Sequence, residues 1–186
     1  MSSIYVITGG RGCGMTTLCS ALSDIGYVVL PDVARKLISE NEKSGSGPLP
    51  WTDFEGFQRA VMLKQKKRES FAAGLDEIIF ANKGLSDTLA HYLARGENKI
   101  PLDIVIDAQR NGYAGVFILD PLPNYRIDAQ RKEIFEYARK IHDNTLGAYQ
   151  ISGHQPFFVP VMSTQDRVKY VLDKIEEVYD IAETVA

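Results

Sequence analysis

The sequence predicts an α/β fold of three layers, in which helices cover both faces of a parallel sheet of about five strands. Short apolar runs rich in β-branched and aromatic residues alternate with longer amphipathic segments. The short runs do not alternate strictly between apolar and polar residues, which indicates strands that are covered on both faces. Strands and helices that alternate along a chain, joined by right-handed crossovers, form this three-layer arrangement.

Five runs are expected to form the strands. Each is bounded by Gly, Pro, Asp or Asn, as buried strands usually are. The runs cover residues 4–8, 27–30, 77–81, 115–119 and 156–161. The first of them leads directly into the glycine-rich segment described below.

Start and stop signals predict the longer helices. Thr52 and Glu55 have the spacing of a capping box, and Gly74 is placed to end the same helix at its C′ position. Ser163 and Asp166 form a similar start signal, with Asp in place of the usual Glu or Gln. Apolar residues recur at helical spacing after that signal, so the chain is expected to finish with an amphipathic helix.

Composition predicts one folded domain over residues 1–186. The chain has 186 residues, of which 45% are hydrophobic and 10% aromatic. A chain of this size buries roughly 70% of the surface that it exposes when unfolded. These properties exclude a disordered chain and a small disulfide-stapled scaffold.

Charge and hydropathy argue against two classes of partner. Lys and Arg number 21 and Asp and Glu 24, which gives a net charge of −3, so we predict no general attraction to nucleic acid or to a membrane. No apolar run approaches the roughly 20 residues that span a bilayer. Cys13 and Cys19 form no CxxC motif and the N-terminal segment does not have the pattern of a secretory signal. We therefore expect a reduced, cytoplasmic protein.

The most informative stretch is a glycine-rich loop between the first strand and the first helix. Gly9-x-x-x-x-Gly14-x-Thr16 has the spacing of the phosphate loop G-x-x-x-x-G-K-[ST]. In such a loop, backbone N–H groups converge on phosphate oxygens and the Thr16 hydroxyl binds Mg²⁺. The residues expected to bind the nucleotide are Gly9, Gly10, Arg11, Gly12, Cys13, Gly14, Met15, Thr16 and Thr17. The alternative is a glycine-rich turn without a ligand.

Met15 breaks the pattern of this loop, because it occupies the position of the lysine. That lysine neutralises the β- and γ-phosphates and follows the charge that develops during phosphoryl transfer. Methionine has a similar length and no charge, and loss of one such group typically costs about 10²–10³ in rate. We therefore expect Met15 to weaken catalysis more than binding.

Four further segments follow the loop in a specific order. They cover residues 31–35 after the second strand, 80–87 after the third, 115–131 from the fourth strand into an arginine-bearing segment, and 159–167 at the last strand and helix start. With the loop, they make nearly the whole chain resemble the P-loop AAA-type domain of the NadR-like group, relatives of nicotinamide-riboside kinase and other small nucleoside kinases.

This resemblance implies a fold, a cofactor and a substrate class. The fold is that of the P-loop NTPases, with the kinase-like strand order 2-3-1-4-5 and a helical lid at about residues 121–132. The cofactor is Mg²⁺ with ATP or GTP, and the second substrate is a small-molecule phosphate acceptor. Thr16, from the spacing of the loop, and Asp32, at the end of the second strand, are the residues that we expect near the metal.

Asn82 and Lys83 differ from the family at two catalytic positions, where the family has an Asp-Arg pair. The family's aspartate lies near Mg²⁺ or the accepting hydroxyl, whereas an asparagine cannot take up a proton at neutral pH. Lys83 keeps a positive charge but lacks the bidentate fork of arginine. Together with Met15, three charged catalytic positions are altered, which indicates a degraded or re-purposed site.

Arg126 and Arg131 lie in the segment that the resemblance identifies as the lid. There they would clamp phosphate as arginine fingers do. A helix is expected to begin nearby, close to Asp128. The alternative for Arg131 is an ion pair on the surface of that helix with Asp128 or Glu136.

Three residues, one of them the altered Lys83, offer partial compensation for the lost charges. Arg11 and Lys83 would add positive charge beside the phosphates, and Asp32 would serve Mg²⁺ or a substrate hydroxyl. For Arg11 the alternative is a solvated loop charge. For Asp32 the alternative is an N-cap for the helix that follows it.

The long helix after Thr52 carries a polar stripe and a basic run. The stripe consists of Gln58, Gln65 and Glu69. It is interpreted either as a solvated face or, from the resemblance, as the lining of an acceptor cleft. The basic run, 64–68, is interpreted as a solvated helix face.

Three hypotheses about function follow. The first is a nucleotide-binding P-loop protein whose phosphoryl transfer or NTP hydrolysis is weak or lost. The second is a catalytically inactive binding or regulatory scaffold that keeps the kinase-like fold. The third is an active parent protein in which Met15, Asn82 and Lys83 are introduced substitutions. We favour the first.

Overall fold

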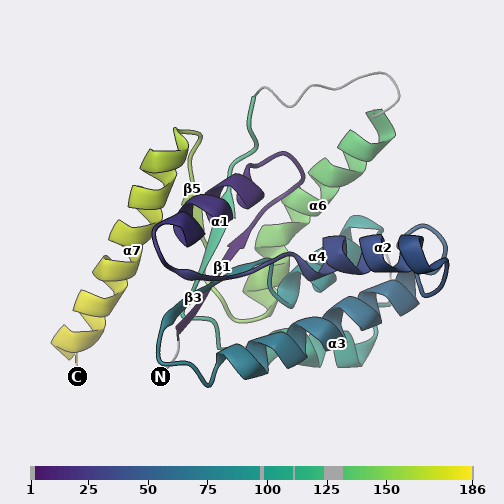
Figure 1. Ribbon diagram of the computed structural model, residues 1–186, viewed down its shortest axis with the longest axis horizontal. Coiled ribbons are helices and arrows are strands. Elements are labelled where there is room, and N and C mark those ends of the chain that lie inside the picture. The colour runs from purple at the N-terminus through teal and green to yellow at the C-terminus, as the bar shows by residue number, and fades with distance from the viewer. Residues whose placement is uncertain (1–2, 97–98, 111, 124–131, 186) are drawn as a thin grey trace.

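The computed structural model describes residues 3–96, 99–110, 112–123 and 132–185 (Figure 1). Five parallel strands form one sheet in the order β2-β3-β1-β4-β5. Their bounds are β1 Ser3–Thr8, β2 Val28–Leu30, β3 Ile78–Asn82, β4 Gly115–Leu119 and β5 Phe157–Val159. Each lies within one of the five predicted runs or extends it by one residue, so the predicted fold class and strand order are confirmed.

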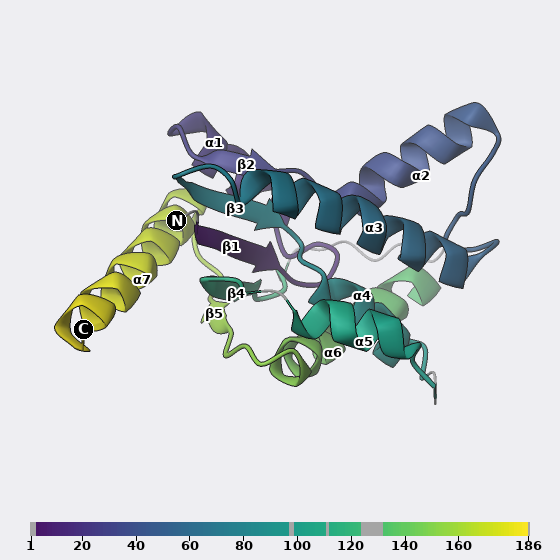
Figure 2. The same cartoon turned by 90° about the horizontal axis from the view of Figure 1, so that it is seen from below.

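Seven helices lie between and after the strands in the described part of the chain. They are α1 Met15–Asp24, α2 Val33–Ser44, α3 Phe54–Ala72, α4 Ser86–Ala94, α5 Leu102–Gln109, α6 Lys132–Ile151 and α7 Thr164–Val185. Figure 1 shows α7 on one side of the sheet and α4 and α6 on the other. Seen from below, α5 lies beside α4 and below α3 (Figure 2).

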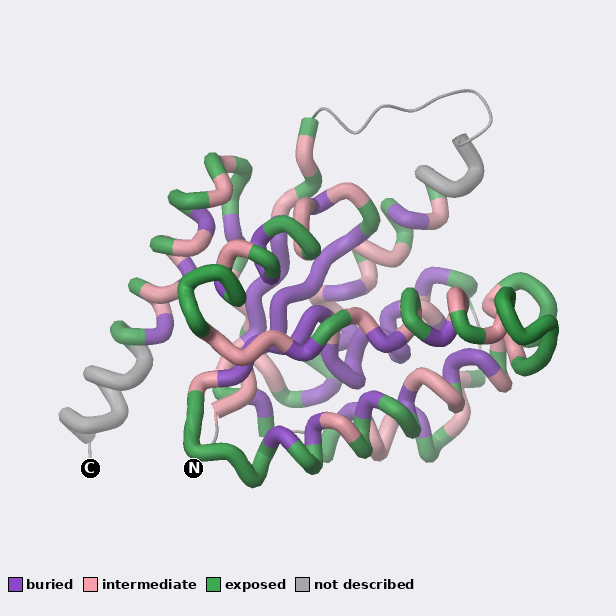
Figure 3. Tube along the Cα trace, in the orientation of Figure 1, coloured by how far each residue is buried: buried purple, intermediate pink, exposed green. Residues whose placement is uncertain are grey.

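Both faces of the sheet are buried, as the absence of alternation in the strand runs predicted. One face packs its Tyr5 and Ile7 against Leu22 of α1 and Ile175 of α7. Figure 3 shows that the central strands are almost entirely buried, while exposed residues gather on the helices and their connections.

The opposite face of the sheet packs against the other helices. Val6 and Val116 contact Ala72 of α3 and Tyr149 of α6 in one buried cluster. Val6 and its neighbours Tyr5 and Ile7 therefore point to opposite sides, as successive strand residues must. The strands are thus fixed from both sides, which holds their carboxyl ends in a common edge.

The start of α3 differs from the prediction by one residue. The carboxylate of Asp53, not the hydroxyl of Thr52, caps the helix by accepting the N–H of Gly56 at 2.9 Å. Thr52 instead donates its hydroxyl to the carbonyl of Leu49 at 3.4 Å. The capping-box prediction for Thr52 is therefore wrong, because the neighbouring Asp is an equally good cap. Gly74 follows the C-cap residue Ala73, at the C′ position that was predicted.

The predicted start of α7 is confirmed. The N–H of Asp166 donates to the hydroxyl of Ser163 at 3.1 Å, and that hydroxyl donates to the Asp166 carboxylate at 2.7 Å. The predicted helix start near Asp128 lies outside the described residues, and α6 is described from Lys132 onward. In the described part of the chain, no helix combines the length and apolar character required to cross a membrane.

Candidate functional site

The glycine loop lies where the sequence placed it, between the carboxyl end of β1 and the start of α1. Gly9, Gly12 and Gly14 adopt φ angles of 144°, 88° and 87°, which side chains other than glycine rarely adopt. Gly14 is the N-cap of α1, and no side chain caps this helix. The N–H groups of its first turn therefore point out of the helix end without intrahelical acceptors, which favours an anion there.

Helix α6 packs directly onto this loop. The N–H of Gly10 donates to Nδ1 of His142 at 3.1 Å, and the Cys13 sulfur lies 3.8 Å from the same nitrogen. A Cβ on residue 10 would lie 2.7 Å from the Cβ of His142, so only glycine fits. One N–H group of the loop is thus bound to the protein itself.

Arg167 anchors the loop from behind. Its side chain is 4% exposed and lies at the start of α7. It donates to the carbonyl oxygens of Cys13 at 2.5 Å, Pro160 at 3.0 Å and Asp120 at 3.2 Å. One guanidinium therefore joins the loop to the residues that follow β4 and β5. Sequence reasoning did not single out Arg167, because its partners lie far away in the chain.

Met15 packs against the hydrophobic core at the position of the missing lysine. Its side chain is partly buried against the core cluster that includes Leu18 and Cys19. Thr16 and Thr17 are exposed in the first turn of α1. The loop therefore presents N–H groups and hydroxyls, with no ammonium at position 15.

Asp32 caps α2, as one of its two interpretations predicted. Its carboxylate accepts the N–H of Arg35 at 3.1 Å. Its charge also reaches α1, because it contributes to the raised pKa of the Cys19 thiol, which burial brings to about 12. Asp32 therefore caps α2, and its charge acts on a buried thiol of α1.

The turn after β3 carries the two other altered positions. Asn82 pairs with Ile7 in the sheet register and is 6% exposed, and its Oδ1 has no hydrogen-bond partner among the described residues. Lys83 has a φ of 73°, and it alone among described non-glycine residues has a positive φ. Such a conformation costs on the order of 1–3 kcal/mol and persists only where the surroundings impose it.

Hydrogen bonds on both sides hold Lys83 in this conformation. Its N–H donates to the carbonyl of Ile7 at 3.0 Å, and its carbonyl accepts Nε2 of Gln65 at 2.8 Å. Its charge acts on Cys13 of the loop, where it opposes the burial that raises the pKa of the thiol to about 11. It also contributes to the low pKa of His91, which burial and Lys83 together bring to about 3. The charge of Lys83 therefore acts on both the loop and α4.

The polar stripe of α3 is buried, so its interpretation as a solvated face is wrong. Gln58, Gln65 and Glu69 are 3%, 3% and 5% exposed. Gln65 donates to Glu69 at 2.5 Å, and the hydroxyl of Tyr113 lies 3.2 Å and 3.1 Å from the two Glu69 oxygens. Burial raises the pKa of Glu69 to about 7 against these hydrogen bonds. Gln65 and Glu69 thus form hydrogen bonds within the protein and are not turned to solvent.

A second buried carboxylate lies beside the turn after β3. Asp87 accepts the hydroxyl of Thr8 at 2.5 Å, the hydroxyl of Tyr149 at 2.6 Å and the N–H of Gly84 at 2.9 Å. Burial raises its pKa, while Lys83 and these donors oppose that change. Asp87 therefore links the last residue of β1 to the turn that carries Lys83.

The remaining predicted residues divide into two groups. Arg11 is exposed on the loop. Arg126, Arg131 and most of the predicted lid, 121–132, lie outside the described residues. No group of three or more His, Cys, Asp or Glu side chains that could hold a metal occurs among the described ones.

Strand order and loop position together define a class of protein. A five-stranded parallel sheet in the order 2-3-1-4-5, with a glycine loop between β1 and α1, is the P-loop fold of nucleotide kinases. Residues 4–167 match the AAA domain family AAA_28, and the chain belongs to that family. No curated protein matches the chain in sequence.

Solved kinase structures share the fold. Thymidylate kinase from Ehrlichia chaffeensis superimposes with a TM-score of 0.64 at 14% identity, over 94% of this chain and 98% of that one. Thymidylate kinase from Candida albicans gives 0.63 at 15% identity, over 95% and 92%. Deoxyadenosine kinase from M. mycoides, with dCMP and dCDP bound, gives 0.61 at 15% identity, over 94% and 99%. At these identities the likeness shows the fold alone.

Proposed function

We propose that this protein binds ATP or GTP with Mg²⁺ on the loop 9–17 and that its phosphoryl transfer or hydrolysis is weak or lost. The observation that carries the proposal is the side chain of Met15, which packs against the core at the position of the phosphate-binding lysine. The loop keeps its glycine geometry and the open N-terminus of α1. Backbone binding of phosphate is therefore retained, while a side-chain cation is missing.

The side chains around the loop suit a magnesium nucleotide. Mg²⁺ prefers oxygen ligands and usually keeps several waters when phosphates bind it. The exposed hydroxyl of Thr16 supplies one oxygen, and Oδ1 of Asn82, which is buried without a partner among the described residues, is a second candidate. Asp32 would bind through a carboxylate oxygen that does not cap α2. When bound, the ion would neutralise charge on the β- and γ-phosphates.

Weak catalysis follows from the residues that would handle charge and protons. The side chain of Asn82, at the end of β3, is an amide, which cannot accept a proton as a carboxylate would. Asp87, the nearby carboxylate, is 4% exposed and already accepts three hydrogen bonds, so it is poorly placed to act as a base. Without the lysine, transition-state stabilisation falls by about 10²–10³ in rate. Lys83, Arg11 and the lid residues Arg126 and Arg131 are the cations left to compensate.

The phosphate acceptor is proposed to be a nucleoside or a nucleoside monophosphate. The resemblance to the NadR-like kinases suggests this class, and the solved neighbours are thymidylate and deoxyadenosine kinases. A reduced cytoplasmic location fits the two buried free thiols.

A scaffold without turnover is the second candidate, and one observation favours it. His142 already accepts the N–H of Gly10, so α6 holds part of the loop closed against the protein. A module that uses its nucleotide, or only its fold, for binding a partner would tolerate this contact. The two proposals differ in whether restored charges bring back turnover.

The test is a reversion series read by both binding and turnover. We expect the native chain to bind ATP or GTP with Mg²⁺ and to turn it over far below the roughly 1–100 s⁻¹ of kinases. Met15→Lys should tighten binding, and the addition of Asn82→Asp and Lys83→Arg should raise turnover. Ser20→Lys is the matched control, since it adds the same charge on an exposed face of α1.

The outcomes separate the candidates. Turnover by the native chain at ordinary kinase rates would contradict the weak-transfer proposal. No binding at about millimolar nucleotide, where even a weak site shows, would refute nucleotide binding itself. Binding without turnover in any variant would favour the scaffold. Thermal denaturation gives an independent check, because ligand at 100 times its Kd adds about 2.7 kcal/mol.

A further inference from the structure

An open cavity lies between helices α2 and α3, separate from the glycine loop. Its volume is about 560 Å³, within the range of small-molecule sites. It is lined by Pro31, Val33, Lys36, Glu40, Lys64, Lys67, Arg68 and Phe71. No residue of the loop 9–17 belongs to this lining, so the cavity is a second candidate site.

The lining has a strong excess of positive charge. Four cationic side chains face one carboxylate, in a chain whose net charge is −3. Glu40 lies 2.7 Å from Lys64 and 3.9 Å from Lys36, so it is shared between two lysines. Lys67 forms no ion pair with any residue in the described part of the chain. An anion would therefore complete the charge balance of this cavity.

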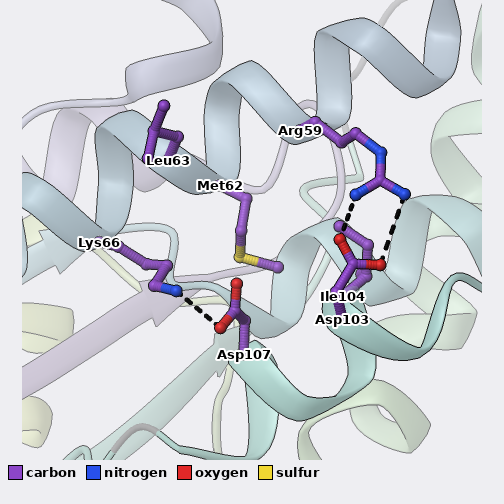
Figure 4. Close-up of a pocket in the computed structure, with 7 residues that line it drawn as sticks. All are labelled: Arg59, Met62, Leu63, Lys66, Asp103, Ile104 and Asp107. Atoms are coloured by element: carbon purple, nitrogen blue, oxygen red, sulfur yellow. Dashed lines mark hydrogen bonds and ion pairs between the residues drawn. The ribbon is translucent and has the colours of Figure 1, made fainter.

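The other side of α3 shows what a balanced surface looks like. There, Lys66 lies 2.6 Å from Asp107 of α5, and Arg59 pairs with Asp103 (Figure 4). The basic run that carries Lys66 and Lys67 therefore divides between two sides of one helix. On the α5 side each of the two cations has its own carboxylate, whereas on the α2 side Glu40 is shared between two lysines, so the excess there is not a general property of α3.

Arg68 gives the cavity a cation that is already held in place. One of its terminal nitrogens donates to the carbonyl of Pro31, and the other to Oε1 of Gln65 at 2.9 Å. Its Nε is buried and has no hydrogen-bond partner in the described part of the chain. A guanidinium fixed in this way loses little conformational entropy when an anion arrives.

The cavity also has an apolar side. Phe71 is 80% exposed at the end of α3, and Pro31 and Val33, on the segment that begins α2, also line the cavity. An exposed aromatic face beside cations suits a planar group that carries a negative charge. Neither a purely inorganic ion nor a neutral apolar molecule would satisfy both parts of the lining.

We propose that the α2–α3 cavity binds a small organic anion that joins a planar aromatic group to a phosphate or a carboxylate. The aromatic group lies against Phe71, and the acidic group is bound by Lys67, Lys36 and Arg68. The site does not depend on nucleotide binding at the glycine loop, since the two share no lining residue.

The experiment uses phenyl phosphate and benzoate as probes, which distinguish the two acidic groups. Trp51 is the sole tryptophan, so Trp51→Phe with Phe71→Trp places one fluorescent reporter at the cavity and keeps an aromatic face there. We expect saturable quenching by at least one probe at about millimolar concentration or below. Inorganic phosphate lacks the aromatic group and phenol lacks the acidic group, so each should bind at least about tenfold more weakly than the better probe.

Charge reversals locate the anion. Lys67→Glu should weaken binding of the probe about tenfold or more, whereas Lys66→Glu, one residue away and facing α5, should leave it within about twofold. Both lysines are surface residues, and circular dichroism checks that both variants fold. Absence of saturable quenching up to about 10 mM would overturn the proposal. So would equal losses in the two variants, or loss of binding on Thr16→Lys in the glycine loop but not on Lys67→Glu.

Discussion

The backbone N–H of Gly10 donates a hydrogen bond of 3.1 Å to Nδ1 of His142, a residue 132 positions later in the chain. This bond holds α6 against the glycine loop. The nitrogen can accept only while it carries no proton. Burial lowers the pKa of His142, which favours that unprotonated form in the folded protein.

We expect acid to weaken this contact and with it the fold. Because the pKa of His142 is lower in the folded chain than in the unfolded one, where it is about 6.5, the unfolded chain takes up more protons as the pH falls through that value. The contribution of His142 to the free energy of unfolding therefore decreases as the pH falls. His142→Asn keeps an acceptor near Nδ1 without a titrating group, so urea denaturation of both proteins from about pH 8 to 5 isolates the effect. Equal pH dependence in the two proteins would contradict it.

Lys83→Gly should make the protein more stable and its nucleotide site weaker. Glycine adopts the observed φ of 73° without strain, so the variant should gain about 1 kcal/mol in free energy of unfolding. It also removes the ammonium near Cys13, so nucleotide affinity should fall. Lys83→Ala loses the ammonium but keeps the strain, and it should be the less stable of the two. Chemical denaturation measures the stability of the three proteins, and nucleotide titration measures their affinity. A glycine variant less stable than the native chain would refute the prediction that Lys83 is strained.

The strands and the glycine loop were predictable because their signals are local. A run such as 115–119 is apolar throughout because both of its faces are buried, and Gly9 and Gly14 show the loop by their spacing alone. The stripe of Gln65 and Glu69 was not predictable in this way. A polar stripe looks the same in sequence whether water or a buried hydroxyl satisfies it, and here the partner, Tyr113, lies 44 residues beyond Glu69.

The same limit explains the residues that sequence reasoning missed. Arg167 reaches the carbonyl of Cys13 across 154 positions, and His142 reaches Gly10 across 132. His142 lies in none of the segments that carry the resemblance, and Arg167 only ends the segment 159–167, so no local signal marks either contact. The prediction for the start of α3 was wrong by one residue for a simpler reason. Thr52 and Asp53 are both good N-caps, and the preceding loop decides which of them caps the helix.

Arg167→Lys should destabilise the protein although it keeps the charge. A lysine ammonium cannot reach three carbonyl oxygens in the plane that the guanidinium spans. At least one of the carbonyls of Cys13, Pro160 and Asp120 then loses its donor in a buried place, at a cost of about 1–3 kcal/mol each. Urea denaturation gives the change, and Lys169→Arg on the exposed side of α7 is the matched control. A change of less than about 0.5 kcal/mol would show that the anchor is dispensable.

Both cysteines should be unreactive in the folded protein. Burial raises the pKa of the Cys13 thiol to about 11 and that of Cys19 to about 12, so almost no thiolate is present at neutral pH. Iodoacetamide should label neither residue at pH 7.5 until urea unfolds the chain. Rapid labelling of Cys13 in native protein would mean that the loop opens away from His142 and Arg167.

The carboxyl of Glu69 should make the protein less stable as the pH rises. Its pKa is about 7 in the folded chain, against about 4.5 when unfolded, so the folded chain binds the extra proton between these values. The contribution of Glu69 to the free energy of unfolding is therefore greatest below about pH 4.5, and it decreases as the pH rises to about 7. Each unit of the difference corresponds to about 1.4 kcal/mol, or roughly 3 kcal/mol in all.

Glu69→Gln tests this directly, because glutamine resembles the protonated carboxyl that burial favours. We expect the variant to lose little stability at pH 5. At pH 8 it should be the more stable protein, because the native carboxyl must then either carry a charge in a buried place or keep a proton at a pH where carboxyl groups in water are ionised. Glu42→Gln, an exposed change on α2, should leave the pH dependence as it is in the native chain. If the Glu69 variant and the native chain lose stability in parallel between pH 5 and 8, Glu69 is already ionised, and the donors Gln65 and Tyr113 outweigh its burial.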